Sequence, residues 1–231
     1  MSNTNQRRHA DNGQALLGDK VMLAAIVVSA IAAVVIGFLY YEPTLGVIGA
    51  LAFAGLGAAV FAVARGTMVS RLVLVFALVA LVALHIQLAR GEIEYHFGVF
   101  VTLALLLVYL DWRPILFSAV LFALHHVGFD RLQAAGWGVY CLGEPDFATI
   151  VVHAAYVVVQ TTFELFFVVR LAGSVRGNAE VASLAQRMQD PTHIVLDMTG
   201  LDVEARLARE LKAVLGRTAT AVQTVREAAQ S

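Results

Sequence analysis

Long uncharged apolar segments alternate with short polar turns along most of the chain. Residues 21–41 contain no charge, and residues 44–64 are again uncharged and rich in Gly and Ala. At 1.5 Å per residue, a helix of this length crosses the ~30 Å hydrocarbon core of a bilayer. The same pattern predicts four further spans, at 72–89, 96–110, 114–129 and 148–169. We therefore expect an all-α, polytopic membrane protein with a bundle of six transmembrane helices.

The fourth predicted span is the shortest, and the first is too long for a signal peptide. Residues 96–110 fall below the usual length of about 17–25 residues, so we expect this span to extend into Glu94–Tyr95 and Asp111–Trp112. The run 21–41 exceeds the signal-peptide core of about 7–15 residues, and no small-residue cleavage site follows it. It is predicted to remain as an anchor.

Composition supports a membrane protein and excludes several other classes. Hydrophobic residues make up 59% of the 231 residues and charged residues 14%, whereas soluble domains have about 45–50% and about 25%. This excludes a soluble enzyme and a disordered protein. A net charge of −1 without a basic tract excludes electrostatic binding of nucleic acid. A single cysteine, Cys141, excludes a disulfide framework.

The distribution of Lys and Arg predicts the orientation in the membrane. With the N-terminus inside, eight basic residues flank the spans on the cytoplasmic side, and only Arg90 and Arg131 lie outside. We expect a protein of the inner (cytoplasmic) membrane with both termini in the cytoplasm. The predicted parts are a tail at 1–20, the membrane domain at 21–171 and a cytoplasmic segment at 172–231.

The sequence of the cytoplasmic segment predicts helix. Residues 174–189 are predicted to form a juxtamembrane helix that breaks at Asp190–Pro191, because proline lacks a backbone donor. From Leu201 onward, apolar and small residues alternate by four and three, as in a coiled-coil seam. This predicts a homodimer with a weak seam, formed by Leu207, Leu211, Val214, Thr218, Ala221, Val225 and Ala228.

Several short motifs lie within residues 85–170: GEIEYHF at 91–97, YLDWRP at 109–114, His125-His126 followed by Leu132-Gln133, and HAAY at 153–156. With these motifs the stretch resembles the six-helix N-terminal sensory region of certain bacterial methyl-accepting chemotaxis proteins. The ending TAVQTVREAAQS resembles the helix that enters their methylated coiled-coil hairpin. The resemblance implies a sensor whose output domain is removed, or absent from a natural short form. The chemotaxis kinase and adaptor would bind only through that missing domain.

Five of the seven histidines lie inside or at the edge of predicted spans. Counted from the nearest external charges, all five lie within roughly 3–10 Å of the outer ends of their helices. Ionisable side chains in a bilayer cost on the order of 2.5 kcal/mol or more and are functional candidates. The five are His85, His96, His125, His126 and His153.

Carboxylates accompany these histidines, and together they suit a non-haem transition-metal centre. Imidazoles with a carboxylate bind iron, copper or zinc, and the supply is sufficient for a mononuclear or a dinuclear site. The predicted ligands are His85, Glu94, His96, His125, His126 and His153, with Glu92, Asp130, Tyr156 and Gln160 around them. Haem b held by two histidines is an alternative. So is a cluster without a cofactor, with interhelical hydrogen bonds or a titrating role.

Three further features have both a functional and a structural interpretation. Glu164 continues a polar stripe below His153, and Asp111 and Arg113 form a turn. These residues either relay a signal or fix helix packing and a corner. The loop 131–147 either covers the histidines as a lid or forms an interfacial aromatic belt. Its Cys141 is an inert small residue, a link between protomers or an added thiolate.

The function class follows from where the polar residues lie. A transporter is expected to place polar groups at mid-depth in broken or repeated helices. A membrane oxidase would leave the coiled-coil tail without a role. A sensor explains both halves, so we expect a non-enzymatic sensory module that detects oxygen, redox state or a metal.

Overall fold

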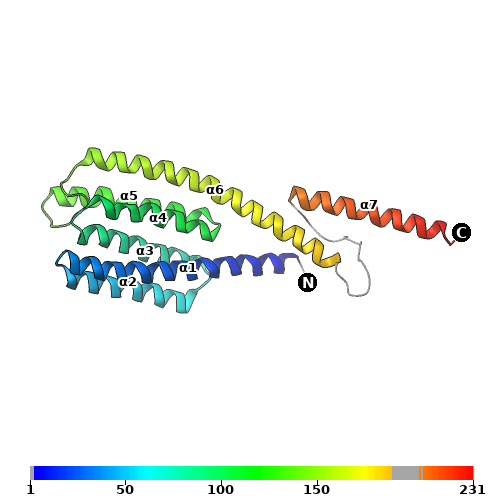
Figure 1. The fold of residues 1–231 in the computed structure, drawn as a ribbon, viewed down its shortest axis with the longest axis horizontal. Coiled ribbons are helices and arrows are strands. Elements are labelled where there is room, and N and C mark those ends of the chain that lie inside the picture. The colour runs from blue at the N-terminus through cyan, green and yellow to red at the C-terminus, as the bar shows by residue number, and fades with distance from the viewer. Residues whose placement is uncertain (1–2, 189–202, 204, 231) are drawn as a thin grey trace. The chain divides into compact units, whose positions relative to one another are not determined.

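The computed structural model describes residues 3–188, 203 and 205–230. All regular elements in these residues are helical, and none of them forms a strand. The expected break at Asp190–Pro191 lies outside the described residues. The elements, coloured along the chain in Figure 1, are α1 (Asn3–Leu39), α2 (Pro43–Ala64), α3 (Met68–Leu88), the 3₁₀ helix η1 (Ile93–His96), α4 (Phe97–Leu105), the 3₁₀ helix η2 (Leu106–Tyr109), α5 (Trp112–Ala134), α6 (Phe147–Met188) and α7 (Arg206–Ala228).

Five helical stretches are long and apolar enough to cross a membrane, which confirms the predicted class. They are Asn12–Leu39, Pro43–Ala64, Met68–Leu88, Trp112–Ala134 and Phe147–Gln186. The predicted fourth span corresponds to the shorter apolar segment Ile93–Tyr109. Its two 3₁₀ ends rise about 2.0 Å per residue, so the segment extends for about 29 Å. This segment is nevertheless shorter in residues than the other five stretches, so a total of six spans stays a prediction.

The last membrane helix is longer than its predicted span. α6 continues without a break from Phe147 to Met188, through the predicted span 148–169 and most of the predicted juxtamembrane helix. Gly173 and Gly177 do not interrupt it, because a glycine costs a helix only about 1 kcal/mol and no proline is present. The predicted sixth span and most of the predicted juxtamembrane helix thus belong to one helix.

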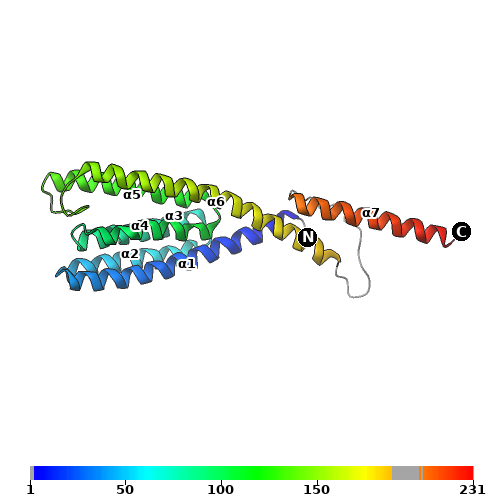
Figure 2. The same ribbon diagram turned by 45° about the horizontal axis from the view of Figure 1, so that its top comes forward.

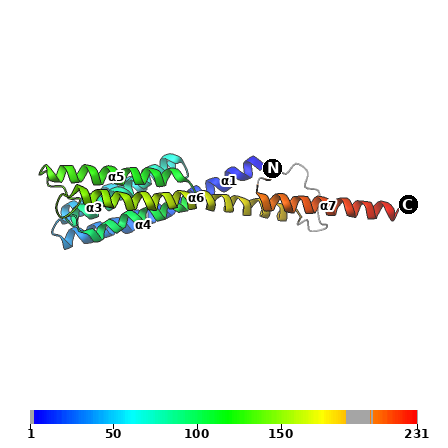
Figure 3. The same cartoon turned by 90° about the horizontal axis from the view of Figure 1, so that it is seen from above.

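The chain divides into two compact units, Arg8–Val169 and Met1–Arg7 with Arg170–Ser231. In the first unit the helices lie side by side. α1 and α2 are on one side, α3 and α4 are in the middle, and α5 and α6 are on the other side (Figures 1 and 2). The turns that follow α1, α3 and α5 lie at the same end of this unit (Figure 3). Side chains from these turns can therefore meet.

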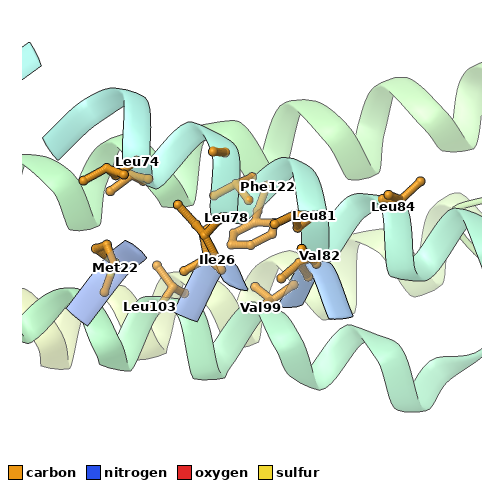
Figure 4. Packing of buried hydrophobic residues seen from close by; sticks show 14 of the residues in the cluster. Met22, Ile26, Leu74, Leu78, Leu81, Val82, Leu84, Val99, Leu103 and Phe122 are labelled. Atoms are coloured by element: carbon orange, nitrogen blue, oxygen red, sulfur yellow. The ribbon is translucent and has the colours of Figure 1, made fainter. Parts of the chain in front are cut away.

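α3 is the central helix of the first unit. Its Leu74, Leu78 and Leu81 are buried against residues of α1, α4 and α5. The ring of Phe122 lies among side chains of α3 and α4 (Figure 4). α1 and α2 approach closely because Gly46 has no side chain: a Cβ there would lie 2.7 Å from the Ala33 carbonyl oxygen.

A buried polar network joins α1 to the turns at the opposite end of this unit. Asp19 is fully buried and accepts hydrogen bonds from the Tyr109 hydroxyl (2.9 Å) and the Gly66 N–H (2.6 Å). Nearby, Arg71 pairs with Asp111 at 3.0 Å. Asp111 also accepts the Arg113 N–H at 3.0 Å and caps α5, and the Arg113 guanidinium lies over the Trp112 ring. The contacts of Asp111 and Arg113 are those of a structural corner.

In the second unit, α7 packs on the end of α6. Ala208 and Leu215 are buried with Leu184, and the Ala205 N–H donates to Glu180 at 2.8 Å. The packed face coincides with the predicted seam only in part: Leu211 packs against this cluster, whereas Leu207, Val214 and Val225 are exposed. The coiled coil stays a prediction.

We expect Tyr109→Phe to lower the stability of the membrane unit by about 1 kcal/mol, since it removes one hydrogen bond from buried Asp19. Thermal unfolding in detergent would measure this as a fall of a few degrees in Tm. Tyr156→Phe, at an exposed position, is the matched control. Equal Tm values for the two variants would contradict the role of the network.

Candidate metal centre

Four of the five predicted histidines meet in the structure. His96 ends η1, His125 and His126 lie on α5, and His153 lies on α6. The His96 ring centroid is 5.4 Å from that of His126 and 5.5 Å from that of His153. The His126 centroid is 6.4 Å from that of His153 and 5.2 Å from that of His125. We call these four residues the histidine cluster.

Backbone carbonyls orient two of these rings. The His96 Nδ1 lies 3.1 Å from the Glu92 carbonyl oxygen, and the His126 Nδ1 lies 2.9 Å from that of Phe122. A carbonyl can only accept, so each Nδ1 carries the proton and, in a neutral ring, the lone pair remains on Nε2. This is the arrangement of most metal-binding histidines, whose second nitrogen donates to a carbonyl or carboxylate. The His96 Nε2 is buried and has no hydrogen-bond partner.

Cys141 completes a group of three potential ligands. One ligand atom each from His96, His126 and Cys141 lies within 4.8 Å of the others, and all three residues are buried. Ligands of a tetrahedral ion at about 2.0–2.3 Å are about 3.5 Å apart, so the widest pair in the group would have to close by at most about 1 Å on binding. Two imidazoles and a thiolate suit copper or zinc. The described residues therefore contain a group within metal-binding distance.

The loop between α5 and α6 brings Cys141 to the histidines. The Gln133 Oε1 accepts the Cys141 N–H at 2.9 Å, and its Nε2 donates to the Leu142 carbonyl at 2.6 Å. From α3, the Gln87 Oε1 accepts the Tyr140 N–H at 2.8 Å. Both glutamines thus hold the loop by its backbone, and its Cys141 lies beside His96 and His126.

Asp130 fixes the far end of the same loop. Its carboxylate is fully buried, pairs with the side chain of Arg131 and accepts the Asp146 N–H at 3.0 Å. Asp146 directly precedes α6, and hydrogen bonds from the Thr149 hydroxyl and N–H hold its pKa below the usual value. Asp130 thus acts on the loop, and it is not in the three-residue group.

The protein environment keeps the Cys141 thiol protonated in the absence of a cation. Burial raises the pKa of the Cys141 thiol to about 12, and the Asp130 carboxylate adds to the rise. A thiol with such a pKa is a poor nucleophile at neutral pH. A metal ion in the group would supply the positive charge that a thiolate needs there.

His125 and His153 belong to the histidine cluster but not to the group of three, and the two other predicted ligands lie apart from both. The His85 Nε2 is 2.8 Å from the Ser29 carbonyl of α1, so His85 forms an interhelical hydrogen bond. The Glu94 side chain is exposed. Residues two apart in a 3₁₀ helix are about 240° apart around its axis, so Glu94 and His96 point to different sides.

The remaining predicted residues have other contacts. Glu92 is exposed and accepts the Tyr40 hydroxyl through its carboxylate. Tyr156 is exposed, while Gln160 donates to the buried Glu164. The second carboxylate oxygen of Glu164 is buried without a hydrogen-bond partner. The predicted stripe on α6 is thus divided between an exposed tyrosine and a buried polar pair.

Cys141 lies in the group of three although the sequence gives no spacing that would place it there. A lone cysteine in a loop is most often inert, and no spacing links it to His96 or His126. The available signal was its position on the predicted outer side, in a loop of low charge beside the histidines. The fold of that loop was needed to place the thiol.

Comparison of the chain with protein-family models, curated proteins and solved structures finds no match. The assignment of the site therefore depends on its own geometry.

We expect the purified protein to bind copper or zinc with about one ion per chain. Elemental analysis after dialysis should show this ion to be lost in His96→Ala, His126→Ala and Cys141→Ser, because each variant removes a ligand. His85→Gln keeps a donor near Ser29 and should retain the ion. Equal metal content in all four variants would contradict this site.

We expect Gly91→Ala to weaken metal binding by tenfold or more. Gly91 has φ +81°, and a Cβ there would lie 2.2 Å from the Leu142 carbonyl carbon, which would displace the loop next to Cys141. Gly136→Ala is the control, since Gly136 has φ +79° and no atom within 4 Å of the added Cβ. Both changes strain the backbone, by about 1–2 kcal/mol. Competition with a chelator of known affinity would separate them.

Proposed function

We propose that the chain is a transmembrane sensory module that binds a transition-metal ion through His96, His126 and Cys141 and uses α6 as its output helix. One observation supports this most: two imidazoles oriented by carbonyls lie beside a buried thiol, with ligand atoms within 4.8 Å. Burying such groups in a membrane is costly without a partner. A cation that all three coordinate would offset that cost.

Copper is the ion that this group favours. A thiolate and two imidazoles suit copper and zinc, whereas a histidine–carboxylate iron site would need the Glu94 carboxylate, which is exposed. Copper would supply one-electron redox chemistry. Three protein ligands also leave a coordination position open for a signal molecule. Redox state or a small ligand would then be the signal.

The packing of the rings argues against haem. Axial histidines face each other across the flat macrocycle. A haem between His126 and His153 would need the space of the His96 ring, whose centroid is within 5.5 Å of both. A single metal ion, by contrast, is small enough to bind where these rings pack closely together.

We place this module in a chemotaxis receptor, on the inner membrane with both termini in the cytoplasm. The support is the resemblance of residues 85–170 to chemoreceptor sensory regions and the distribution of Lys and Arg. In this orientation the cluster lies in the periplasmic third of six spans, the fourth being Ile93–Tyr109. The exposed Leu207, Val214 and Val225 would form the homodimer seam that leads to an output domain.

α6 is suited to carry a change from the cluster. His153 lies near its start, with its ring stacked on His96 at 5.5 Å and an interplanar angle of 20°. The helix continues unbroken to Met188. A shift of His96 on ligand binding would thus change the equilibrium between two conformations that differ in the position of α6.

The test is a fusion of residues 1–231, in seam register, to a chemoreceptor signalling hairpin. Kinase activity in membrane vesicles should change at least twofold when copper is added or chelated. His126→Ala should abolish the change, and His85→Gln should preserve it.

If the protein binds copper but the kinase activity does not change with copper, the sensory assignment is overturned and the metal site is retained. Copper flux through the protein in liposomes would instead support a transporter.

A further inference from the structure

A cavity of about 390 Å³ lies between α5 and α6, next to the histidine cluster. Most of its wall is apolar, and His126 and His153 are in the wall. Val120 and Val158 line the cavity and are also exposed on the outer surface of the helices, so the cavity is open to lipid. Its volume is in the range of small-molecule binding sites, about 300–1,000 Å³.

Two residues in this wall each have a buried polar atom without a hydrogen-bond partner. The Thr161 side chain is 8% exposed, and its hydroxyl is buried and unpaired. Its neighbour Thr162 is also in the wall, but the Thr162 hydroxyl donates to the Val158 carbonyl at 2.7 Å. The His153 Nδ1 is buried and unpaired as well. An apolar chain alone would leave both groups unsatisfied, at a cost.

We propose that this cavity binds a membrane quinone. Thr161 and His153 are eight residues apart on α6, or about 12 Å along the axis. A para-quinone has oxygens about 5 Å apart, and two hydrogen bonds of about 2.8 Å bring the span to about 11 Å. The axial separation of the two residues thus matches the span that one ring would bridge, once both side chains turn toward the cavity.

The chemistry of the two groups fits both redox forms of such a ligand. A hydroxyl and a neutral imidazole can each donate or accept a hydrogen bond. They can therefore donate to the two carbonyls of a quinone or accept from the two hydroxyls of a quinol. The apolar wall would hold the ring and the start of the isoprenoid tail, which leaves toward lipid past Val120 and Val158.

This site adjoins the proposed metal group at His126 but hydrogen-bonds its ligand through other residues. It uses Thr161 and His153, whereas the metal group uses His96, His126 and Cys141. The bound ring would lie against His126 and His153. A redox-active lipid would thus contact two members of the histidine cluster, and the quinone pool becomes an input to the module.

The probe is a decylubiquinone that carries an azide on its ring, photolysed with the full chain in detergent, with labelled peptides mapped by mass spectrometry. We expect saturable labelling of residues 116–127 and 150–165. Excess decylubiquinone should block it, and an equal amount of decylbenzene, which has no oxygen, should not.

Thr161→Val should raise the half-saturating concentration of the azidoquinone roughly three- to tenfold, because the variant loses one hydrogen bond. Thr162→Val should leave it within twofold, since that hydroxyl is already paired to the backbone. Ala154→Phe, which fills the cavity, should abolish labelling. Metal content, measured on the same samples, should stay unchanged in the two threonine variants.

Equal labelling of the Thr161→Val and wild-type chains would overturn the proposal, and so would equal competition by decylbenzene, which would identify a slot for an acyl chain. Absence of labelling would overturn it too, whether lipid or a second copy covers the cavity. If labelling behaves as expected in a protein that binds no metal, only the metal proposal fails.

Discussion

Lipid offers no hydrogen bonds, so every polar group that this chain places in the membrane must find its partner within the protein. Many of these groups form a direct hydrogen bond to a neighbouring helix, a turn or their own helix. Tyr109 and the Gly66 N–H satisfy Asp19, His85 bonds to the Ser29 carbonyl, and Thr162 bonds to its own helix. These contacts fix the packing of the helices and need no ligand.

The unsatisfied groups have a different distribution. Among the described residues, eight buried side-chain polar atoms lack a hydrogen-bond partner. Those of His96, His125, His153 and Thr161 belong to the histidine cluster or to the wall of the neighbouring cavity. Because burial without a partner is unfavourable, such a concentration is typical of a site that is completed by a ligand. The same constraint that stabilises the helices thus identifies the region where function is expected.

The loop between α5 and α6 couples the fold to this region. It contributes the thiol of Cys141, and Gln133 and Gln87 hold its backbone. Gly91 allows the turn after α3 to touch it, since any side chain there would collide with Leu142. The site therefore depends on residues of α3 and α5 that never reach a metal ion, and a change in any of them would move the ligand.

The sequence by itself determined the helical membrane class and five of the helices, because uncharged length is a local property, and it predicted a shared depth for the histidines from their distance to charged residues. It could not decide which side chains converge. His85 forms a hydrogen bond to α1, Glu94 lies on an exposed side of a 3₁₀ helix, and the loop places Cys141 beside His96 and His126. Depth along a helix follows from counting residues, whereas rotation about its axis and the course of a loop depend on packing, and only the tertiary structure decided these.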